Sequence, residues 1–461
     1  MKNLTFRNIR EATRGKLIGG HKADTGEITA VISDSRKVRP GCLFLCIPGE
    51  HVDGHDFAVQ AVEDGAAGVM AERIIPELDA PCIIVDSILE ATQRLAEYYR
   101  KSLEIKVVGI TGSVGKTGTK ELIAAVLKRR YKVVKTQGNL NNQWGVPFTI
   151  FEIEEDDEAA VIEMGISGFG EMDELSYMVK PDIVVITNIG RSHLEFLKNP
   201  DGILKAKSEI FNHMNPEGHI ILNGDDDMLI GLKPPSGKRP EYFGLNRECD
   251  VSAERIVEKG LDGVEFDVVI RDGGGKISFH VNLPIPGRHM VYNALAAVQV
   301  GIDMGVPLMD IKEALSRAQG VEGRNRIIRM DGLTLIDDCY NASPVSMMAA
   351  VDLLKSVKGR KVAILGDMFE LGDDSDKYHF QVGRYAGESG ADLIICVGQN
   401  SEKMFMGARL ASDKSVEYFK SLEDAIEMVP AFLRKGDTVL LKASNGMNFK
   451  QLLGVLQERA N

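Results

Sequence analysis

Short runs of aliphatic and β-branched residues alternate with amphipathic stretches along the middle of the chain. The runs that we predict to be strands are residues 106–111, 132–136, 160–164, 183–189, 219–223 and 242–245. Residues 183–186 are apolar at every position, which is typical of a strand buried on both faces of a parallel sheet. The alternation therefore predicts an α/β domain in which crossover helices cover a parallel sheet.

The pattern changes on either side of this region. Between residues 250 and 284 alternating positions predict a small antiparallel meander appended to the same domain, followed by a helix over residues 291–303. Shorter strands are predicted near the N-terminus at residues 30–32, 42–47 and 83–85, with a helix over residues 88–99. Further strands are predicted at residues 333–337, 361–365, 393–397 and 438–442. Three domains follow, with expected bounds 1–100, 101–320 and 321–461, the last of them doubly wound.

Composition excludes several classes of protein. The 461 residues are 44% hydrophobic and 26% charged, and 55 basic against 67 acidic residues give a net charge of −12, which disfavours nucleic acid and anionic membranes as partners. Six scattered cysteines without a C-x-x-C pair indicate buried thiols in a reducing compartment. Charges interrupt the N-terminal segment and no run approaches the roughly 20 apolar residues of a membrane span. We expect a cytoplasmic monomer without a membrane span.

A glycine-rich loop follows the first central strand and precedes an amphipathic helix. Its residues are Thr111, Gly112, Ser113, Val114, Gly115, Lys116 and Thr117. In this context the glycines let backbone N–H groups converge on phosphate oxygens, Lys116 adds a positive charge, and Thr117 can bind Mg²⁺. The chain has neither the Asn-Lys-x-Asp guanine signature nor a G-x-G-x-x-G motif, so ATP is preferred to GTP or a dinucleotide.

The loop is similar to that of the Mur ligase family, and other segments extend the resemblance to all three predicted domains. In the central domain these segments are residues 138–147, 162–165, 187–193 and 205–211. Residues 34–41 and 53–57 resemble the uridine-nucleotide module of the family. Asp337-Asp-Cys-Tyr-Asn-Ala-Ser-Pro344 and residues 365–372 resemble the members that add D-alanyl-D-alanine.

The resemblance implies a central P-loop ATPase domain, an N-terminal uridine-nucleotide-binding α/β module and a C-terminal Rossmann-like domain that closes on ATP. It implies that ATP phosphorylates the peptide carboxylate of UDP-N-acetylmuramoyl-tripeptide. The amine of D-alanyl-D-alanine then attacks the acyl phosphate and phosphate leaves, which gives the pentapeptide precursor of peptidoglycan. Such chemistry depends on charge neutralisation more than on a nucleophilic side chain.

The same resemblance implies the catalytic and metal-binding roles. Lys116, His193 and Lys207 are the expected catalytic residues. Of two expected Mg²⁺ ions, the first is assigned to Thr117 and Glu163, and the second to His193 and Lys207. Lys207 is expected as a carbamate formed with CO₂, because an ammonium group repels a cation and a carbamate oxygen can bind it.

Nucleotide and substrate contacts are implied in the same way. Besides the loop, the expected ATP contacts are Asn293, Arg324 and Asp338. The expected substrate contacts are Ser35 and Arg36 for the uridine nucleotide, Asn139, Asn141 and Asn142 for the sugar and peptide, and Tyr340, Asn341 and Ser343 for the dipeptide. A turn-forming role for the asparagines is a second interpretation. Residues 320–323 are the expected hinge.

Two positions depart from the family pattern, and other functions remain open. Met290 stands where asparagine is frequent, and Asn445 stands where arginine is frequent. The alternatives are a tripeptide-forming Mur ligase, a folate-polyglutamylating or other carboxylate–amine ligase of the superfamily, and a nucleotide switch that hydrolyses ATP slowly and moves a partner. The motif at residues 341–344 argues against the first alternative, and the uridine-nucleotide module against the second.

Overall fold

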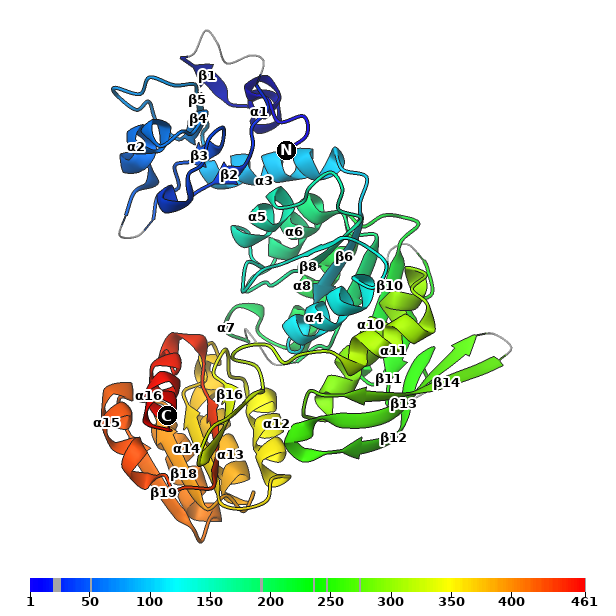
Figure 1. Ribbon diagram of the computed structural model, residues 1–461, viewed down its shortest axis with the longest axis vertical. Coiled ribbons are helices and arrows are strands. Elements are labelled where there is room, and N and C mark those ends of the chain that lie inside the picture. Colours follow the sequence, from blue (N-terminus) through cyan, green and yellow to red (C-terminus); the bar gives the residue numbers. More distant parts are fainter. Residues whose placement is uncertain are drawn as a thin grey trace.

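The computed structural model describes residues 1–19, 26–49, 52–190, 194–234, 237–245, 248–272 and 275–460. Three β-sheets follow one another along the chain, each with helices packed against it (Figure 1). The protein is therefore an α/β protein of three domains, as the alternation of strands and helices predicted. The central domain lies between the other two (Figure 1).

The N-terminal sheet has five short strands in the order β1-β5-β4-β3-β2. Their bounds are β1 Lys16–Ile18, β2 Val31–Ile32, β3 Leu43–Leu45, β4 Gly68–Ala71 and β5 Cys82–Ile84. The accompanying helices are α1 Phe6–Thr13, α2 Ala58–Glu63 and the 3₁₀-helices η1 Ser35–Lys37 and η2 Gly54–Phe57. β1 is antiparallel to β5, and the other pairs are parallel. The sequence pattern did not predict β1 or β4.

The central sheet has nine strands in the order β14-β13-β12-β11-β10-β9-β6-β8-β7. Their bounds are β6 Lys106–Thr111, β7 Val133–Lys135, β8 Ala159–Glu163, β9 Ile183–Ile186, β10 His219–Asn223, β11 Glu241–Gly244, β12 Val251–Glu258, β13 Val264–Asp272 and β14 Gly275–Leu283. All six predicted central strands are present. The predicted meander is present as antiparallel β12–β14, and β12 also pairs in parallel with β11, so the meander continues the main sheet.

Helices cover both faces of the central sheet. They are α4 Lys116–Leu127, α5 Gly145–Phe151, α6 Glu171–Val179, α7 Leu194–Leu197, α8 Pro200–Ser208, α9 Asp227–Ile230, α10 His289–Asp303 and α11 Leu308–Ser316, with η3 Glu209–Phe211 and η4 Gly260–Asp262. Apolar side chains of α4, α10 and α11 share one buried cluster, and those of α5, α6 and α8 share another. The first elements of the site, β6 and α4, are thus fixed by the burial of most of their residues.

The C-terminal sheet has six strands in the order β15-β16-β20-β17-β18-β19. Their bounds are β15 Arg326–Arg329, β16 Leu333–Asp338, β17 Lys361–Gly366, β18 Leu393–Val397, β19 Ser415–Phe419 and β20 Asp437–Lys442. The helices are α12 Pro344–Lys355, α13 Ser375–Gly387, α14 Ser401–Ala411, α15 Leu422–Phe432 and α16 Lys450–Ala460, with η5 Gly372–Asp374 and η6 Asn445–Met447. α12, α13 and α14 pack on one face and α15 and α16 on the other, which is the predicted doubly wound arrangement.

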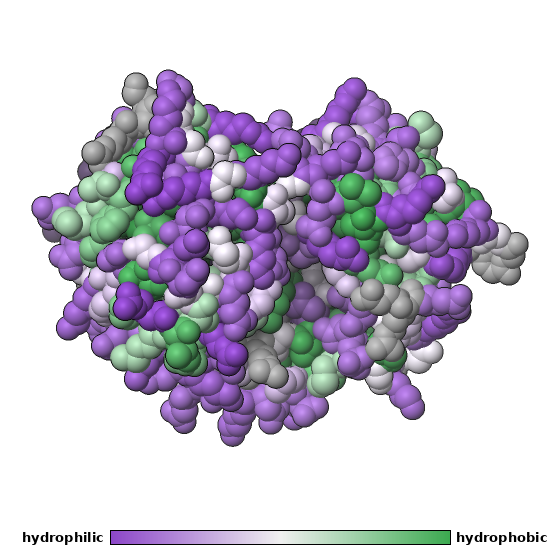
Figure 2. All heavy atoms as spheres, turned by 90° about the horizontal axis from the view of Figure 1, so that it is seen from below, coloured by the Kyte–Doolittle hydropathy of each residue, from purple (hydrophilic) through white to green (hydrophobic). Residues whose placement is uncertain are grey.

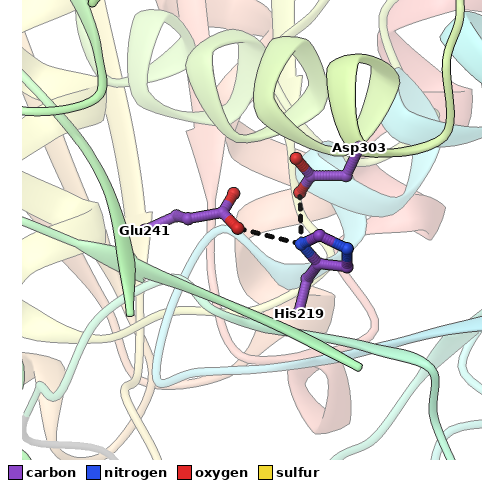
Figure 3. A group of neighbouring side chains, drawn as sticks. All are labelled: His219, Glu241 and Asp303. Atoms are coloured by element: carbon purple, nitrogen blue, oxygen red, sulfur yellow. Dashed lines mark hydrogen bonds and ion pairs between the residues drawn. The ribbon is translucent and has the colours of Figure 1, made fainter. Parts of the chain in front are cut away.

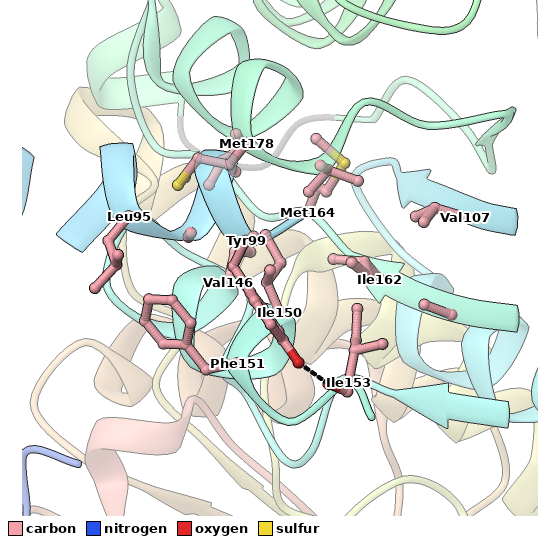
Figure 4. Packing of buried hydrophobic residues seen from close by; sticks show 14 of the residues in the cluster. Leu95, Tyr99, Val107, Val146, Ile150, Phe151, Ile153, Ile162, Met164 and Met178 are labelled. Carbon is pink, nitrogen blue, oxygen red and sulfur yellow. Dashed lines mark hydrogen bonds between the residues drawn. The ribbon is translucent and has the colours of Figure 1, made fainter. Parts of the chain in front are cut away.

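Helix α3, Ile88–Lys101, joins the N-terminal and central domains through one apolar cluster. Leu95 and Tyr99 of α3 lie against Phe151 and neighbouring side chains of the central domain (Figure 4). The Tyr99 hydroxyl is buried there and donates a hydrogen bond to the carbonyl oxygen of Ile153 at 2.6 Å. Burial raises the pKa of Tyr99 to about 12, so the hydroxyl remains a donor at neutral pH.

The surface and the cysteines agree with the composition. Hydrophilic side chains cover most of the face in Figure 2, and apolar side chains appear there in small separate groups. All six cysteines are free and buried, as predicted. Within the described ranges, each helix is too short or too polar to cross a membrane.

We expect Tyr99→Phe to lower the free energy of unfolding by about 1–2 kcal/mol, because the buried carbonyl of Ile153 loses its donor. Urea unfolding followed by circular dichroism measures this loss. Tyr98→Phe is the matched control, since the Tyr98 hydroxyl makes no hydrogen bond in the part of the chain that the structure describes. Equal stability of Tyr99→Phe and the native chain would show that this bond does not contribute to the domain junction.

Candidate active site

The glycine-rich loop lies between the end of β6 and the start of α4, at the carboxyl edge of the central sheet. Gly112 and Gly115 have φ angles of 145° and 85°, in the region that favours glycine. A Cβ atom on Gly112 would lie 1.9 Å from the Thr187 hydroxyl oxygen, which follows the neighbouring strand β9. Glycine is therefore required at residue 112 by both the backbone angle and the close approach of the next strand.

Asn188 holds the loop in place through both its backbone and its side chain. Its carbonyl oxygen accepts a hydrogen bond from Ser113 N at 3.0 Å, and its Oδ1 accepts one from Val114 N at 3.0 Å. Its Nδ2 donates to the Val114 carbonyl oxygen at 2.9 Å. The sequence reasoning gave Asn188 no role and placed it inside the predicted strand 183–189, whereas β9 ends at Ile186 and Asn188 follows it at the edge of the sheet that holds the loop.

Lys116 begins helix α4, and its ammonium group lies inside the loop. Nζ donates to the Gly112 carbonyl oxygen at 2.7 Å. Burial lowers the pKa of Lys116, the negative charge of Glu163 opposes this change, and the positive charge of Arg324 adds to it. Because the first N–H groups of a helix have no acceptor within the helix, the loop and α4 together form a site suited to an anion.

Glu163 ends strand β8 and is buried beside the loop. Its Oε2 accepts a hydrogen bond from the Thr117 hydroxyl at 2.9 Å, and its Oε1 accepts one from Asn141 Nδ2 at 2.9 Å. The ammonium nitrogen of Lys120 lies 3.8 Å from Oε2 and donates to the Thr136 carbonyl oxygen at 2.7 Å. The sequence reasoning missed Lys120, whose place three residues before Ile123 in the apolar stripe of α4 indicated burial.

Lys205 and Lys207 lie on α8 and differ in burial. Lys205 is exposed, whereas only 1% of Lys207 is exposed. Burial, and then the charge of Lys116, hold the pKa of Lys207 well below its usual value. A buried lysine with a lowered pKa is often a neutral amine, which is the reactive form of the side chain. His193 lies outside the described residues.

The C-terminal domain contributes a buried ion pair to the same region. Lys442 Nζ donates to Asp338 Oδ2 at 2.6 Å and to the Asn341 carbonyl oxygen at 2.9 Å. Asn325 N donates to Asp338 Oδ1 at 3.3 Å. Burial raises the pKa of Asp338, and the charge of Lys442 opposes this change. Asp338 and Lys442 end β16 and β20, which pair in parallel, so their side chains meet at the carboxyl edge of this sheet.

Two further contacts lie beside the site, the first within the C-terminal domain and the second between that domain and helix α10. The guanidinium carbon of Arg324 lies 4.1 Å from the centroid of the Tyr340 ring, within the range of a cation–π interaction. Asn325 Nδ2 lies 3.2 Å from Nε2 of His289, the first residue of α10. Burial, and then the charge of Lys442, lower the pKa of His289 to about 4, so this histidine is neutral at neutral pH.

A cavity of about 660 Å³ lies between the central and C-terminal domains. It is lined from both sides by expected site residues, namely Ser113, Val114, Gly115, Lys116, Asn139, Asn141, Asn142, Glu163, Asn293, Arg324, Asp338, Tyr340, Asn341 and Ser343. Thr111, Gly112, Thr117 and Lys207 do not line it. The geometry therefore brings the phosphate loop and the residue 337–344 motif to one cavity.

Several expected contact residues have structural partners. Asn142 Oδ1 accepts from the backbone N–H groups of Trp144 and Gly145 at 3.2 and 2.9 Å, which agrees with the turn-forming interpretation. The Ser343 hydroxyl caps α12 by accepting from Ser346 N at 3.4 Å. Asn341 Oδ1 accepts from Ala342 N at 2.8 Å. These side chains are held by the backbone around them.

Ser35 and Arg36 are not among the residues that line the cavity. They begin η1 in the N-terminal domain, and Arg36 Nε and Nη2 donate to the two carboxylate oxygens of Asp34, each at 2.9 Å. The Arg36 side chain is 87% exposed. A ligand that reaches both η1 and the cavity has to be extended.

The two departures from the family pattern lie in the cavity wall. Met290 Sδ accepts a hydrogen bond from Asn293 Nδ2 at 3.3 Å. Asn293 lies next to the loop, because a Cβ on Gly115 would be 3.1 Å from its Oδ1. Asn445 also lines the cavity. The thioether at residue 290 thus supports Asn293 instead of offering an amide to a ligand.

The donor set fits a nucleotide and Mg²⁺. A hydroxyl and a carboxylate oxygen meet at Thr117 and Glu163, and Mg²⁺ prefers oxygen ligands. The glycines of the loop leave space for phosphate oxygens beside Lys116. The arrangement defines the class of the protein: a P-loop α/β protein whose C-terminal domain faces the phosphate site across a cavity.

The chain belongs to the Mur ligase family. Residues 110–301 match the Mur ligase middle domain, residues 323–445 match the Mur ligase glutamate ligase domain, and residues 27–101 match the Mur ligase family catalytic domain. These three matches cover parts of all three sheets.

Relatives of known name match along almost the whole chain. The chain is 37% identical to the UDP-N-acetylmuramoyl-tripeptide–D-alanyl-D-alanine ligase of Bacillus subtilis and 33% identical to that of Escherichia coli, covering 99% of each chain in both cases. It resembles a crystal structure of MurF from Acinetobacter baumannii with a TM-score of 0.88 at 34% identity, covering 99% of both chains. MurF of Thermotoga maritima in complex with ADP gives a TM-score of 0.81 at 28% identity, covering 94% of this chain and 98% of that one.

We expect Lys442→Met to lower the free energy of unfolding by about 3 kcal/mol or more at neutral pH, because Asp338 remains buried without its partner. The pKa of Asp338 is already above that of an unfolded chain and rises further in this variant. The folded variant therefore binds a proton at Asp338 more readily than the unfolded variant. Its loss of stability relative to the native chain becomes smaller as pH falls. Urea unfolding across a pH series measures both effects.

The double variant Asp338→Asn/Lys442→Met is the control for this prediction. It removes both charges, so it recovers much of the lost stability at neutral pH and its deficit depends less on pH. A Lys442→Met deficit that stays constant over the pH series contradicts the assignment of the loss to the Asp338 charge.

Proposed function

We propose that the protein is an ATP-dependent, ADP-forming ligase that joins D-alanyl-D-alanine to UDP-N-acetylmuramoyl-tripeptide through an acyl phosphate. The observation that carries this proposal is the cavity in which the phosphate loop faces the residue 337–344 motif. The relatives that match along 99% of the chain carry this activity in their names. The product is the pentapeptide precursor of peptidoglycan.

The reaction has two steps. A carboxylate oxygen of the tripeptide attacks the γ-phosphorus of ATP, the bond to the β-phosphate oxygen breaks, and ADP leaves. The amine of the dipeptide then attacks the acyl carbon, loses a proton, and expels inorganic phosphate. In the first step two anions approach each other, so the site has to offer positive charge where they meet. Lys116 is suited to this role by its place in the loop.

The nucleotide is assigned to residues 111–117 together with Asn293, Arg324 and Asp338. The positive φ angles of Gly112 and Gly115 and the support from Asn188 favour a phosphate held by the loop. Arg324 faces the cavity from the C-terminal side and suits a phosphate oxygen, while the Asp338 carboxylate suits a ribose hydroxyl. A nucleotide between these groups excludes water when the C-terminal domain closes, which protects an acyl phosphate from hydrolysis.

Two Mg²⁺ ions are assigned to this chain. Thr117 and Glu163 would hold the first, and the hydrogen bond between them keeps both oxygens in one place. His193 and Lys207 would hold the second. Lys207 would do so as a carbamate, which forms when the neutral amine adds to CO₂ and loses a proton. The burial and lowered pKa of Lys207 favour the neutral amine. Bound Mg²⁺ supplies charge neutralisation between the reacting anions.

The extended substrate is assigned to two places, the N-terminal domain and the cavity between the other two domains. Ser35 and Arg36 would contact the uridine nucleotide, and Asn139, Asn141 and Asn142 the sugar and peptide. Tyr340, Asn341 and Ser343 would contact the dipeptide. The distance of η1 from the cavity wall suits a substrate with a nucleotide at one end and a peptide carboxylate at the other. Six free buried thiols favour the cytoplasm as the place of the reaction, and we propose that the enzyme acts as a monomer.

We expect phosphate release from ATP in the presence of UDP-N-acetylmuramoyl-tripeptide to accelerate by more than about tenfold with D-alanyl-D-alanine. The full-length protein is assayed with the dipeptide, with meso-diaminopimelate, with lysine and without an acceptor. The single amino acids should give little acceleration. Mass spectrometry should detect the amide product in the same amount as the released phosphate.

Two other results of this assay would identify an alternative function. An equal response to meso-diaminopimelate or lysine moves the assignment to a tripeptide-forming ligase. Full phosphate release without any acceptor or peptide substrate favours a nucleotide switch and contradicts the ligase proposal.

We expect Lys207→Ala to lower kcat by about two orders of magnitude or more, because a metal ligand is lost. Lys205→Ala is the matched control: it removes a lysine from the same helix, but that lysine is exposed, and turnover should be preserved. Small carboxylic acids should partly restore the activity of Lys207→Ala by taking the place of the carbamate. An active Lys207→Ala enzyme removes the carbamate from the mechanism.

A further inference from the structure

Three metal-ligating side chains meet at the edge of the central sheet opposite the phosphate loop. His219 and Glu241 are the first residues of the neighbouring parallel strands β10 and β11, and Asp303 is the last residue of α10. Parallel strands begin at one edge and end at the other, whereas the loop follows the end of β6. The 15 residues of α10 correspond to a length of about 22 Å, so this cluster is distinct from the proposed Mg²⁺ sites.

The three side chains point toward one another. In Figure 3 both carboxylates face the same nitrogen of the His219 ring. This nitrogen, Nδ1, lies 2.9 Å from Glu241 Oε1 and 3.8 Å from Asp303 Oδ2. One potential ligand atom from each residue lies within 4.8 Å of the other two. The exposed fractions of the His219, Glu241 and Asp303 side chains are 46%, 29% and 7%, so the group is reached from solvent on one side.

Hydrogen bonds do not account for the whole cluster. Gln299 Nε2 donates to one carboxylate oxygen of Glu241 and to Asp303 Oδ1, which holds the two acids side by side. Asp303 Oδ2 is buried and accepts no hydrogen bond among the described residues. A protonated His219 has one Nδ1–H group, which the bond to Glu241 uses, and 3.8 Å is too long for a second bond. One oxygen of the Asp303 carboxylate, whose side chain is 7% exposed, therefore faces the cluster without a hydrogen bond among the described residues.

We propose that His219, Glu241 and Asp303 bind one Zn²⁺ ion, with water completing its coordination from the exposed side. An imidazole nitrogen and two carboxylate oxygens are ligands that Zn²⁺ accepts in its usual tetrahedral geometry, whereas Mg²⁺ favours oxygen ligands alone. A bound cation would neutralise the charges of two acids that lie side by side, one of which has a side chain only 7% exposed.

The role of this site is structural. An ion bound there connects the starts of β10 and β11 to the end of α10. The opposite end of α10 carries His289 and Asn293, which contact the hinge side and the loop. The metal would therefore fix the helix that forms part of the cavity wall, without taking part in phosphoryl transfer.

Zinc binding to chelator-treated, full-length protein tests the proposal. Isothermal titration calorimetry is performed with Zn²⁺ at neutral pH in excess MgCl₂, which occupies sites that prefer Mg²⁺. We expect one Zn²⁺ site whose affinity falls by about tenfold or more in His219→Ala and in Asp303→Asn. His280→Ala is the matched control, because His280 Nδ1 also lies 2.9 Å from a carboxylate oxygen, that of Asp267, but this pair lies outside the cluster. It should bind Zn²⁺ as the native chain does.

Thermal unfolding provides a second measurement that does not depend on activity. Zn²⁺ should raise the Tm of the native chain and of His280→Ala by the same amount, and that of His219→Ala and Asp303→Asn by less at the same Zn²⁺ concentration. Unfolding without metal checks that each variant is folded. The proposal is overturned if the native chain binds no Zn²⁺ in excess Mg²⁺, or if His219→Ala binds it as tightly as the native chain; the three residues then form an ion-paired group only. Neither result affects the proposed ligase activity.

Discussion

The arrangement of the site depends on the interactions of the buried Glu163 carboxylate with its neighbours. Glu163 ends β8 and accepts hydrogen bonds from Thr117 in α4 and from Asn141 in the segment before α5, while the Lys120 ammonium lies within 4 Å. A buried charge is costly unless it is paired and hydrogen-bonded, so these partners cannot be placed independently. The loop, the first turn of α4 and the asparagine segment are thus held in one geometry, and a divalent cation bound there would replace part of this network.

Positive charge is concentrated around that carboxylate. Burial and then the charge of Lys116 lower the pKa of Lys207, and Arg324, from the C-terminal domain, adds to the effect of burial in lowering the pKa of Lys116. Without anions, such a group of cations opposes closure of the domains. A triphosphate between them reverses the sign of the interaction, so that ligand binding and closure favour each other. A carbamate on Lys207 would change the local charge in the same direction, because it converts a potential cation into an anion.

The strongly apolar strands could be predicted from the sequence, and the weaker ones could not. β6 and β10 have the predicted bounds, because an exposed polar first residue is followed in each by a short apolar run that is buried in the sheet. β1 has three residues and β4 contains glycine and alanine, so their pairing with neighbours, and not their own pattern, makes them strands. The site motifs could be recognised in the sequence. That Lys207 is buried while Lys205 is exposed could not be predicted, because it depends on how α8 packs. The domain bounds and the residue roles stay predictions.

The position of the meander affects how the C-terminal domain is held. β12–β14 is appended to the central domain as predicted, and the pairing of β12 with β11 makes it continuous with the main sheet. As a continuation of the main sheet it carries η4 to the C-terminal domain, where Leu261 packs on the apolar cluster that includes Met347 and where Arg329 Nη2 donates to Asp262 Oδ1 at 2.6 Å. The η4 contact and the Asn325–His289 contact therefore both hold the C-terminal domain against the central one. An exposed ion pair contributes little, so breaking the Arg329–Asp262 contact would add little to the cost of the proposed domain closure.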